Sequence, residues 1–361
     1  QLSKSKSPGN FAIPVDNDCV INSVRVGVVG ARGAVGSEFF RLFSMRGWEM
    51  AEVRAFGSQR SLGTVLSTPF GELPVNLPAN GAFSGLDIVY FSAGSGVSRE
   101  FAPLAVEEGA IVVDNSSAFR MDQNVPLVVP EVNGHILTSE HRLIANPNCS
   151  AAIMLMAVAP LRHFGKLKRI VVSTYQSASG AGWAAMEELR NQTRDVLDGK
   201  DPNPQVLPHP YAFNLFSHNT PIAENGYNDE ENKIILESRK ILNDPDIEIN
   251  PTCVRVPVLR AHSESINIEF DRPAPSEEAV RDVLAAAPGV KIVDDREANV
   301  FPMPLDASGI DDVLVGRIRR DITNRNAINL FVSGDQLLKG AALNAVQIGE
   351  LVLGITPKLQ A

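Results

Sequence analysis

The chain has 361 residues, of which 44% are hydrophobic and 21% charged, a composition typical of a globular protein of about two domains. No segment approaches the ~20 consecutive apolar residues of a membrane span, and a net charge of −9 argues against nucleic-acid binding. The cysteines Cys19, Cys149 and Cys253 are too scattered for a disulfide framework or a metal site, so we expect a reducing, cytoplasmic location.

The N-terminal part of the chain predicts a nucleotide-binding domain over residues 23–149, preceded by a polar extension over residues 1–22. Residues 24–29 (VRVGVV) are apolar except for Arg25 and predict a short buried strand. A glycine-rich segment (GARGAVG, 30–36) connects this strand to an amphipathic helix, which is the context of a dinucleotide-binding turn. Its G-x-x-G-x-x-G spacing differs slightly from the usual G-x-G-x-x-G. Gly30 and Gly33 would still let the backbone approach a pyrophosphate, whereas Gly36 is also explained by helix–strand packing.

The segment after the second predicted strand favours NADP over NAD. NAD enzymes usually place an acidic residue at such a strand end, about 20 residues beyond the glycines, to bind the ribose hydroxyls. Here residues 57–61 read GSQRS and contain no carboxylate. Arg60, flanked by serines, suits a 2′-phosphate, although a solvated loop arginine is the alternative.

Three further strands, over residues 86–91, 110–114 and 143–145, complete the pattern of a parallel sheet with flanking helices. Polar turns follow their ends, at residues 92–96, 115–117 and 146–149. Ligands of open α/β sheets bind beyond the carboxyl ends of the strands. The sequence therefore predicts that a cofactor and a cysteine share one crevice.

Cys149 lies in the turn Asn146-Pro147-Asn148-Cys149, directly before an apolar run that predicts a helix over residues 152–158. With Asn148 as the helix cap, the thiol would lie in or just before the first turn. That position should lower the pKa of the thiol and favour the nucleophilic thiolate. A buried structural cysteine is the alternative.

The remaining chain predicts an α+β catalytic domain over residues 150–335, with a mainly antiparallel sheet. Strands are expected over residues 169–176, 252–258, 264–270, 314–318 and 327–332, and a helix over 229–242. A closing helix near residues 339–350, within a C-terminal segment 336–361, should return to the first domain.

His262 and Arg255 are candidate site residues on the strand-like segments of this second half. On one straight strand, positions seven residues apart would face opposite sides of the sheet. If both side chains line one site, the chain must bend between them, and Pro257 is a plausible place.

Taken together, these segments resemble the family of aspartate-β-semialdehyde dehydrogenases from about residue 24 to residue 350. The matching segments are GARGAVG (30–36), DNSSAFR (114–120), VVPEVN (128–133), NPNC (146–149), YQSASGAG (175–182), VRVPVLRAHS (254–263) and KGAALN (339–344). The resemblance implies a Rossmann-type domain plus a catalytic domain. It also implies NADPH-dependent reductive dephosphorylation of L-aspartyl-4-phosphate, a step in lysine (through diaminopimelate), threonine and methionine synthesis.

The resemblance also implies a role for each matching residue. Cys149 would be the nucleophile that forms an acyl thioester, His262 the acid/base, and Gln176 the residue that positions the substrate. Arg255 would bind the substrate carboxylate, and Glu230 would contribute a second group to the substrate pocket. Arg120 and Lys233 would bind phosphate.

The cofactor NADP would contact Gly30, Arg32, Gly33, Ala34, Val35, Arg60, Ser61, Ser179, Gly180 and Gln336. Arg32 departs from the family, which usually has a small or hydroxyl residue there. Backbone N–H groups do the binding in such a turn, so we expect function to survive and cofactor affinity to differ.

Two other functions remain open on the sequence. N-acetyl-glutamyl-phosphate reductase is a related acyl-phosphate reductase, but the contexts of Gln176 and Arg255 argue against it. A catalytically silent scaffold relative should have lost Cys149, His262 or Gln176, and this chain keeps all three. The expected partners are a small-molecule substrate and further copies of the chain, as a homodimer or a dimer of dimers.

Overall fold

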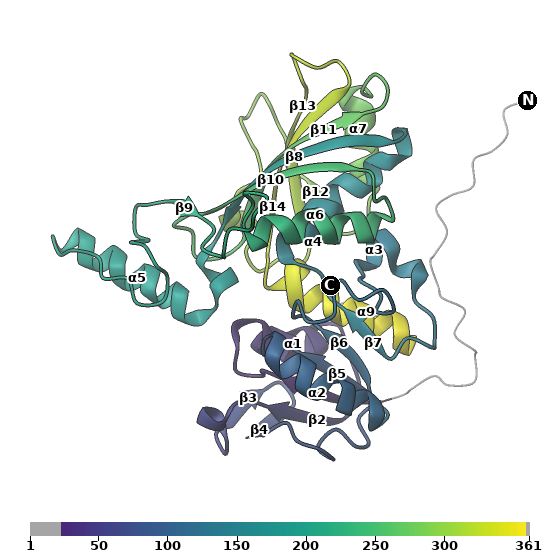
Figure 1. Cartoon of the computed structure of the whole chain (residues 1–361), viewed down its shortest axis with the longest axis vertical. Coiled ribbons are helices and arrows are strands. Elements are labelled where there is room, and N and C mark those ends of the chain that lie inside the picture. Colours follow the sequence, from purple (N-terminus) through teal and green to yellow (C-terminus); the bar gives the residue numbers. More distant parts are fainter. Residues whose placement is uncertain (1–22, 359–361) are drawn as a thin grey trace, which may run out of the picture.

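The computed structural model describes residues 23–358, so the extension predicted for residues 1–22 lies outside the described residues. Two seven-stranded sheets organise the described chain, and each has its own hydrophobic core. Figure 1 shows them as two bodies, with α4 (Cys149–Val158) and α9 (Leu343–Leu353) where the two meet. Within residues 23–358, every helix is too short or too polar to cross a bilayer.

The first sheet has the strand order β3-β4-β2-β1-β5-β6-β7 and is parallel except for the β3–β4 pair. From β1 the chain first builds one side of the sheet and then returns to add β5 on the other side. The β1/β5 border is thus a switch point, where such folds bind ligands. The strands are β1 (Val24–Val29), β2 (Met50–Phe56), β3 (Val65–Thr68), β4 (Gly71–Asn76), β5 (Ile88–Phe91), β6 (Ile111–Asp114) and β7 (Leu143–Ala145).

Helices cover both faces of this sheet, which confirms the predicted Rossmann-type arrangement. On one face, α1 (Ala34–Met45) packs with the C-terminal α9 (Leu343–Leu353) and the π-helical turn η5 (Leu338–Ala342) around Phe39 and Tyr90. On the other face, α2 (Ser95–Glu107) packs on a cluster that includes Phe83 and Phe91.

The second sheet has the order β12-β13-β14-β11-β8-β10-β9, and four of its six strand pairs are antiparallel, as predicted. Its apolar face packs on α4 (Cys149–Val158), α6 (Asp229–Leu242) and α7 (Glu277–Ala285). The strands are β8 (Leu167–Gln176), β9 (Phe216–Ser217), β10 (Glu248–Arg255), β11 (His262–Phe270), β12 (Val290–Ile292), β13 (Val313–Arg320) and β14 (Ala327–Gly334).

Short elements connect these parts, and one long helix, α5 (Trp183–Leu197), extends away from the second sheet in Figure 1. The others are η1 (Gln59–Ser61), α3 (Pro130–Asn133), η2 (Gly134–Ile136), η3 (Ala159–Phe164), η4 (Ala178–Ala181) and α8 (Pro304–Ala307).

The strand predicted over residues 252–258 ends earlier than expected, at Arg255. The chain then crosses the end of β8, because β10 pairs with one edge of β8 and β11 with the other. Backbone hydrogen bonds from Ala178 N to Val258 O (2.8 Å) and from Ser179 N to Leu259 O (3.0 Å) hold this crossover. A crossover between two strands therefore replaces the predicted bend at Pro257.

Candidate active site

A cavity of about 420 Å³ lies where the carboxyl ends of the first sheet meet the second domain. The first domain contributes turns after β5 and β6, and the second contributes side chains from the ends of β8, β10 and β11. The predicted residues that line it are Val35, Arg120, Cys149, Gln176, Ser179, Gly180, Glu230, Lys233, Arg255, His262 and Gln336. Within residues 23–358, no group of three or more His, Cys, Asp or Glu side chains is arranged to hold a metal ion.

Cys149 is the first residue of α4, as the sequence predicts. The Asn148 side chain caps this helix by accepting hydrogen bonds from the backbone N–H groups of Ser150 (3.0 Å) and Ala151 (3.2 Å). The neighbouring π-helical turn comes so close that a Cβ on Gly340 would lie 2.7 Å from Cys149 Cβ. A side chain at position 340 would therefore clash with Cys149, which explains a glycine there.

The predicted lowering of the Cys149 pKa is wrong. Burial, followed by the negative charge of Glu230, raises the pKa of Cys149 to about 12, against the opposing effect of Arg120 and Arg255. The local sequence predicts the helix terminus correctly. It cannot show how deeply Cys149 is buried, or that α6 places the Glu230 carboxylate nearby, and both effects raise the pKa of the thiol.

His262 is a buried, neutral imidazole whose tautomer is set by the backbone. Its Nδ1 accepts a hydrogen bond from the Ser177 N–H (3.1 Å), so the ring proton lies on Nε2. Nε2 has no hydrogen-bond partner among residues 23–358. Burial, and then Arg255, lower the pKa of His262 to about 3. The ring therefore offers an N–H donor to a ligand in the cavity.

Arg255 lines the same cavity as Cys149, so the predicted convergence of Arg255 and His262 is confirmed. The register places Arg255 opposite Gln176 at the end of β8, and Ser263 opposite Tyr175 on the other edge. The guanidinium donates from Nη1 to Ser177 O (3.2 Å). Its Nε is buried and has no partner within the described chain, so a donor remains for a carboxylate ligand.

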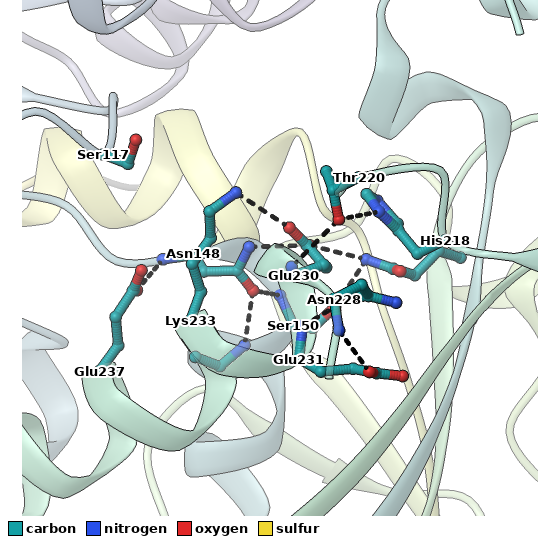
Figure 2. A network of polar contacts seen from close by, with 12 residues as sticks. Ser117, Asn148, Ser150, His218, Thr220, Asn228, Glu230, Glu231, Lys233 and Glu237 are labelled. Atoms are coloured by element: carbon teal, nitrogen blue, oxygen red, sulfur yellow. Dashed lines mark hydrogen bonds and ion pairs between the residues drawn. The ribbon is translucent and has the colours of Figure 1, made fainter. Parts of the chain in front are cut away.

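Glu230, on α6, connects that helix to the cysteine turn (Figure 2). Its Oε1 accepts from Asn148 Nδ2 (2.8 Å) and from Gln176 Nε2 (3.0 Å), and its Oε2 lies 3.4 Å from Lys233 Nζ. Burial acts to raise the pKa of Glu230, but His218, Lys233 and these hydrogen bonds lower it to about 2. The carboxylate is therefore charged at neutral pH.

Glu237 is a site residue that the sequence analysis missed. Its Oε1 pairs with Arg120 Nη1 (2.9 Å), and its Oε2 accepts from the backbone N–H of Asn148 (2.6 Å; Figure 2). It lies seven residues after Glu230 and four after Lys233, so all three share one face of α6. That helical spacing is the signal that could have identified it.

A second cavity, of about 610 Å³, lies at the glycine turn, and Ser92 lines both cavities. Gly30 has a φ of 85°, and a Cβ there would lie 2.3 Å from Ser92 O, so only glycine allows the backbone of this turn to lie so close to β5. Of the predicted cofactor residues, this cavity contains Gly30, Arg32, Gly33, Arg60 and Ser61.

Three other predicted cofactor residues, Ser179, Gly180 and Gln336, line the first cavity close to His262. Gln336 accepts from Ala261 N (2.9 Å) and donates to Ser179 Oγ, and a Cβ on Gly180 would lie 3.1 Å from the His262 ring. Ala34, the first residue of α1, lines neither cavity.

Comparisons with known proteins agree on one family. Models described as the NAD binding domain and the dimerisation domain of semialdehyde dehydrogenase match residues 25–139 and 158–339. Aspartate-semialdehyde dehydrogenase of Synechocystis sp. is 52% identical over 330 residues, which cover 91% of this chain and 97% of the relative.

Solved structures give the same result. The crystal structure of aspartate semialdehyde dehydrogenase II from Vibrio cholerae, complexed with ASA, has a TM-score of 0.88 and 40% identity, covering 92% of this chain and 98% of its own. The enzyme from Candida albicans with NADP has a TM-score of 0.71 and 25% identity, covering 92% and 99%.

Proposed function

Because this chain belongs to the family of aspartate-semialdehyde dehydrogenases, we propose that it converts L-aspartyl-4-phosphate and NADPH to L-aspartate-4-semialdehyde, phosphate and NADP. The reaction would serve lysine, threonine and methionine synthesis in the cytoplasm. The observation that carries the proposal is the convergence of Cys149, Arg255 and His262 in one cavity, where Arg255 Nε and His262 Nε2 have no hydrogen-bond partner among residues 23–358.

The first step is attack of Cys149 Sγ on the acyl carbon of the substrate. A carbon–sulfur bond forms, the bond to the phosphate oxygen breaks, and the thiol proton leaves with the phosphate as hydrogen phosphate. Arg255 holds the substrate carboxylate, and Glu230 faces the substrate ammonium group. Covalent catalysis of this kind divides a difficult displacement into two easier steps.

The departing phosphate lies between Arg120 and Lys233. Arg120 is held by Asn146 O (2.8 Å), Asn115 O (2.7 Å) and Glu237, which together fix its guanidinium at the cavity wall. A guanidinium and an ammonium group facing one small space provide the charge that stabilises a leaving phosphate.

His262 stabilises the carbonyl oxygen of the thioester as negative charge develops on it. Its Nε2–H, fixed by the Ser177 backbone, belongs to a ring that lines the cavity, and a preorganised donor of this kind stabilises developing negative charge. When bound, NADPH would supply the hydride to the acyl carbon. As the aldehyde forms, the carbon–sulfur bond breaks and the Cys149 sulfur takes up a proton from solvent, which restores the thiol.

The cavity at the glycine turn fits a dinucleotide and favours NADP. A side chain on Gly30 would collide with Ser92 after β5, so only the bare backbone fits there. A bare backbone can approach a pyrophosphate closely. Arg32 and Arg60 both line the cavity, and no Asp or Glu is among its lining residues from the described chain. A 2′-phosphate would therefore meet positive charge without a competing carboxylate.

We also propose that the chain forms a homodimer, because residues 158–339 match the dimerisation domain of the family. Light scattering coupled to gel filtration should give twice the mass of one chain. A dimer of dimers would give four times that mass, and a monomer would contradict the proposal.

The reverse reaction tests the function directly. The purified protein should form NADPH from L-aspartate semialdehyde and NADP only when phosphate is present. N-acetylglutamate semialdehyde, assayed in parallel, should react far more slowly. Comparable rates with both aldehydes would favour the reductase alternative, and activity without phosphate would contradict the acyl-phosphate product.

A further inference from the structure

His218 lines the catalytic cavity, and the proposed reaction gives it no role. It follows the edge strand β9, and its backbone N–H donates to Cys253 O (2.8 Å), which fixes it beside β10. Only 8% of the residue is exposed. Figure 2 shows its side chain beside Thr220 and near Glu230, within the polar network of the cavity.

Both nitrogens of the His218 ring are engaged by the protein. Nε2 lies 2.9 Å from Arg255 Nη2, and because a guanidinium carries only donors, Nε2 must be the acceptor. Nδ1 therefore carries the proton and donates to Thr220 Oγ1 at 3.2 Å. That hydroxyl also accepts from the Glu230 backbone N–H (3.2 Å), which ties the ring to the start of α6.

The contact with His218 completes the fixation of Arg255. Ser177 O binds Nη1 and His218 binds Nη2, so both terminal nitrogens of the guanidinium are anchored from different segments of the chain. Nε is left as a donor without a partner in the described chain. Two anchors on a planar group fix its plane, and the plane decides whether a carboxylate can bind by two parallel hydrogen bonds.

We infer that His218 is a positioning residue, a neutral hydrogen-bond acceptor that holds the Arg255 guanidinium in the orientation that binds the substrate carboxylate. This inference rests on the proposed role of Arg255 in the reaction. Burial lowers the pKa of His218 to about 4, with Glu230 opposing and Arg255 and Lys233 adding to the effect, so the ring remains an acceptor at neutral pH. Unlike His262, His218 has no free ring nitrogen to offer a substrate.

Three variants separate the acceptor from the bulk of the side chain. In His218→Gln, the amide oxygen can take the place of Nε2 and accept from Arg255. In His218→Asn, the shorter amide cannot reach, and in His218→Leu the acceptor is absent. The Gln and Asn variants differ by one methylene group and decide the question even if the Leu variant does not fold.

The Asn and Leu variants should raise the KM for L-aspartate semialdehyde by about tenfold or more, the effect expected for one hydrogen bond to a charged group. Their kcat should change by less than about threefold. The Gln variant should stay within about threefold of the wild-type KM. The KM values for NADP and phosphate should not change in any variant, which separates a positioning role from general damage.

Wild-type KM values in the Asn and Leu variants would overturn the inference, and so would a Gln variant as impaired as Asn. A crystal structure of His218→Asn adds a test that needs no substrate, because Arg255 should lose its observed orientation. An unchanged guanidinium there would overturn the inference whatever the reaction is. Failure of the wild-type protein to oxidise aspartate semialdehyde would instead contradict the proposed function.

Discussion

At the scale of single residues, Cys149 shows what a local pattern can and cannot predict. The polar turn and the apolar run that follows predict the helix start, because capping depends on neighbouring residues. The pKa of the thiol depends on groups far away in the sequence, above all on burial and on Glu230. A raised pKa fits an attack in which Cys149 loses its proton as the carbon–sulfur bond forms.

Replacing Cys149 by serine should abolish turnover while leaving the fold intact. A hydroxyl is harder to deprotonate than a thiol, and the site already disfavours negative charge at this position. We expect kcat for phosphate-dependent NADPH formation to fall by at least about 1000-fold. NADP binding, measured by calorimetry, should be unchanged. A serine variant with near wild-type turnover would exclude the covalent mechanism.

Substitution of Arg60 tests whether the protein prefers NADP over NAD. The Arg60→Ala variant should bind NADP about tenfold more weakly, the low end of the range for a charged hydrogen bond, because Arg60 is solvent-exposed. NAD binding should hardly change. Arg99→Ala, which removes an exposed arginine of α2 outside both cavities, serves as the control. Equal losses for NADP and NAD would show that Arg60 does not contact the 2′-phosphate.

Arg255 and His262 should give different kinetic defects. Lysine at position 255 keeps the charge but loses the planar fork, so Arg255→Lys should raise the KM for the semialdehyde by about tenfold or more. His262→Asn should mainly lower kcat, by about 100-fold or more, since it removes the donor to the reacting oxygen and leaves the carboxylate site intact. Steady-state kinetics with each substrate varied will measure both, and the opposite pattern would reverse the two assignments.

At the scale of elements, α6 shows how one helix can supply several parts of a site. Its start is evident in the sequence, because Asn228 and Glu231 form a reciprocal capping box. Resemblance to the family identifies Glu230 and Lys233. Glu237 is not evident from either source, because its role depends on how α6 packs against the turn before α4.

The cap of α6 should matter for both stability and activity. Asn228→Ala should lower the free energy of unfolding by about 1–2 kcal/mol, since a buried cap is lost. It should also raise the KM for the semialdehyde, because Glu230 lies in the first helical turn. Ser276→Ala removes the cap of α7, away from the cavity, and should cost similar stability without a kinetic effect. Urea denaturation and steady-state kinetics will distinguish the two, and identical kinetic effects would contradict the argument.

The crossover from β10 to β11 is a feature of the fold that local sequence patterns cannot predict. Alternation of side chains predicts two strands correctly, but it cannot show that β8 lies between them. Arg255 and His262 thus reach one cavity from opposite edges of β8, whereas the sequence analysis expected a bend near Pro257 to bring them together. Strand order depends on pairing between distant segments, which a local pattern does not contain.

At the scale of the whole molecule, the catalytic cavity depends on how the two domains are joined. Arg260, in the crossover of the second domain, bridges Glu38 of α1 (2.8 Å) and the buried Asp335 (2.6 Å). The sequence predicts both domain types because each follows a regular pattern of strands and helices. It does not predict this ion-pair link, because no local pattern brings residues 38, 260 and 335 together.

The buried Glu264 side chain should make the free energy of unfolding of the protein depend on pH. It lies on β11, two residues after His262, is fully buried, and neither carboxylate oxygen has a hydrogen-bond partner within residues 23–358. Burial raises the pKa of Glu264 well above its usual value. The folded protein therefore holds a proton that the unfolded chain releases above pH ~4.3. Between the pKa of Glu264 in the unfolded chain and its higher pKa in the folded protein, the free energy of unfolding therefore falls as the pH rises.

Glu264→Gln should remove this cost because glutamine does not titrate. The variant should gain free energy of unfolding relative to the wild-type protein as the pH rises from 5 to 8, by up to about 1.4 kcal/mol per pH unit within that window. Urea denaturation of both proteins at pH 5 and pH 8 measures the difference. A gain that is the same at both pH values would reflect packing alone. A gain that shrinks toward pH 8 would mean that Glu264 is charged in the folded protein, with a partner that stabilises the carboxylate.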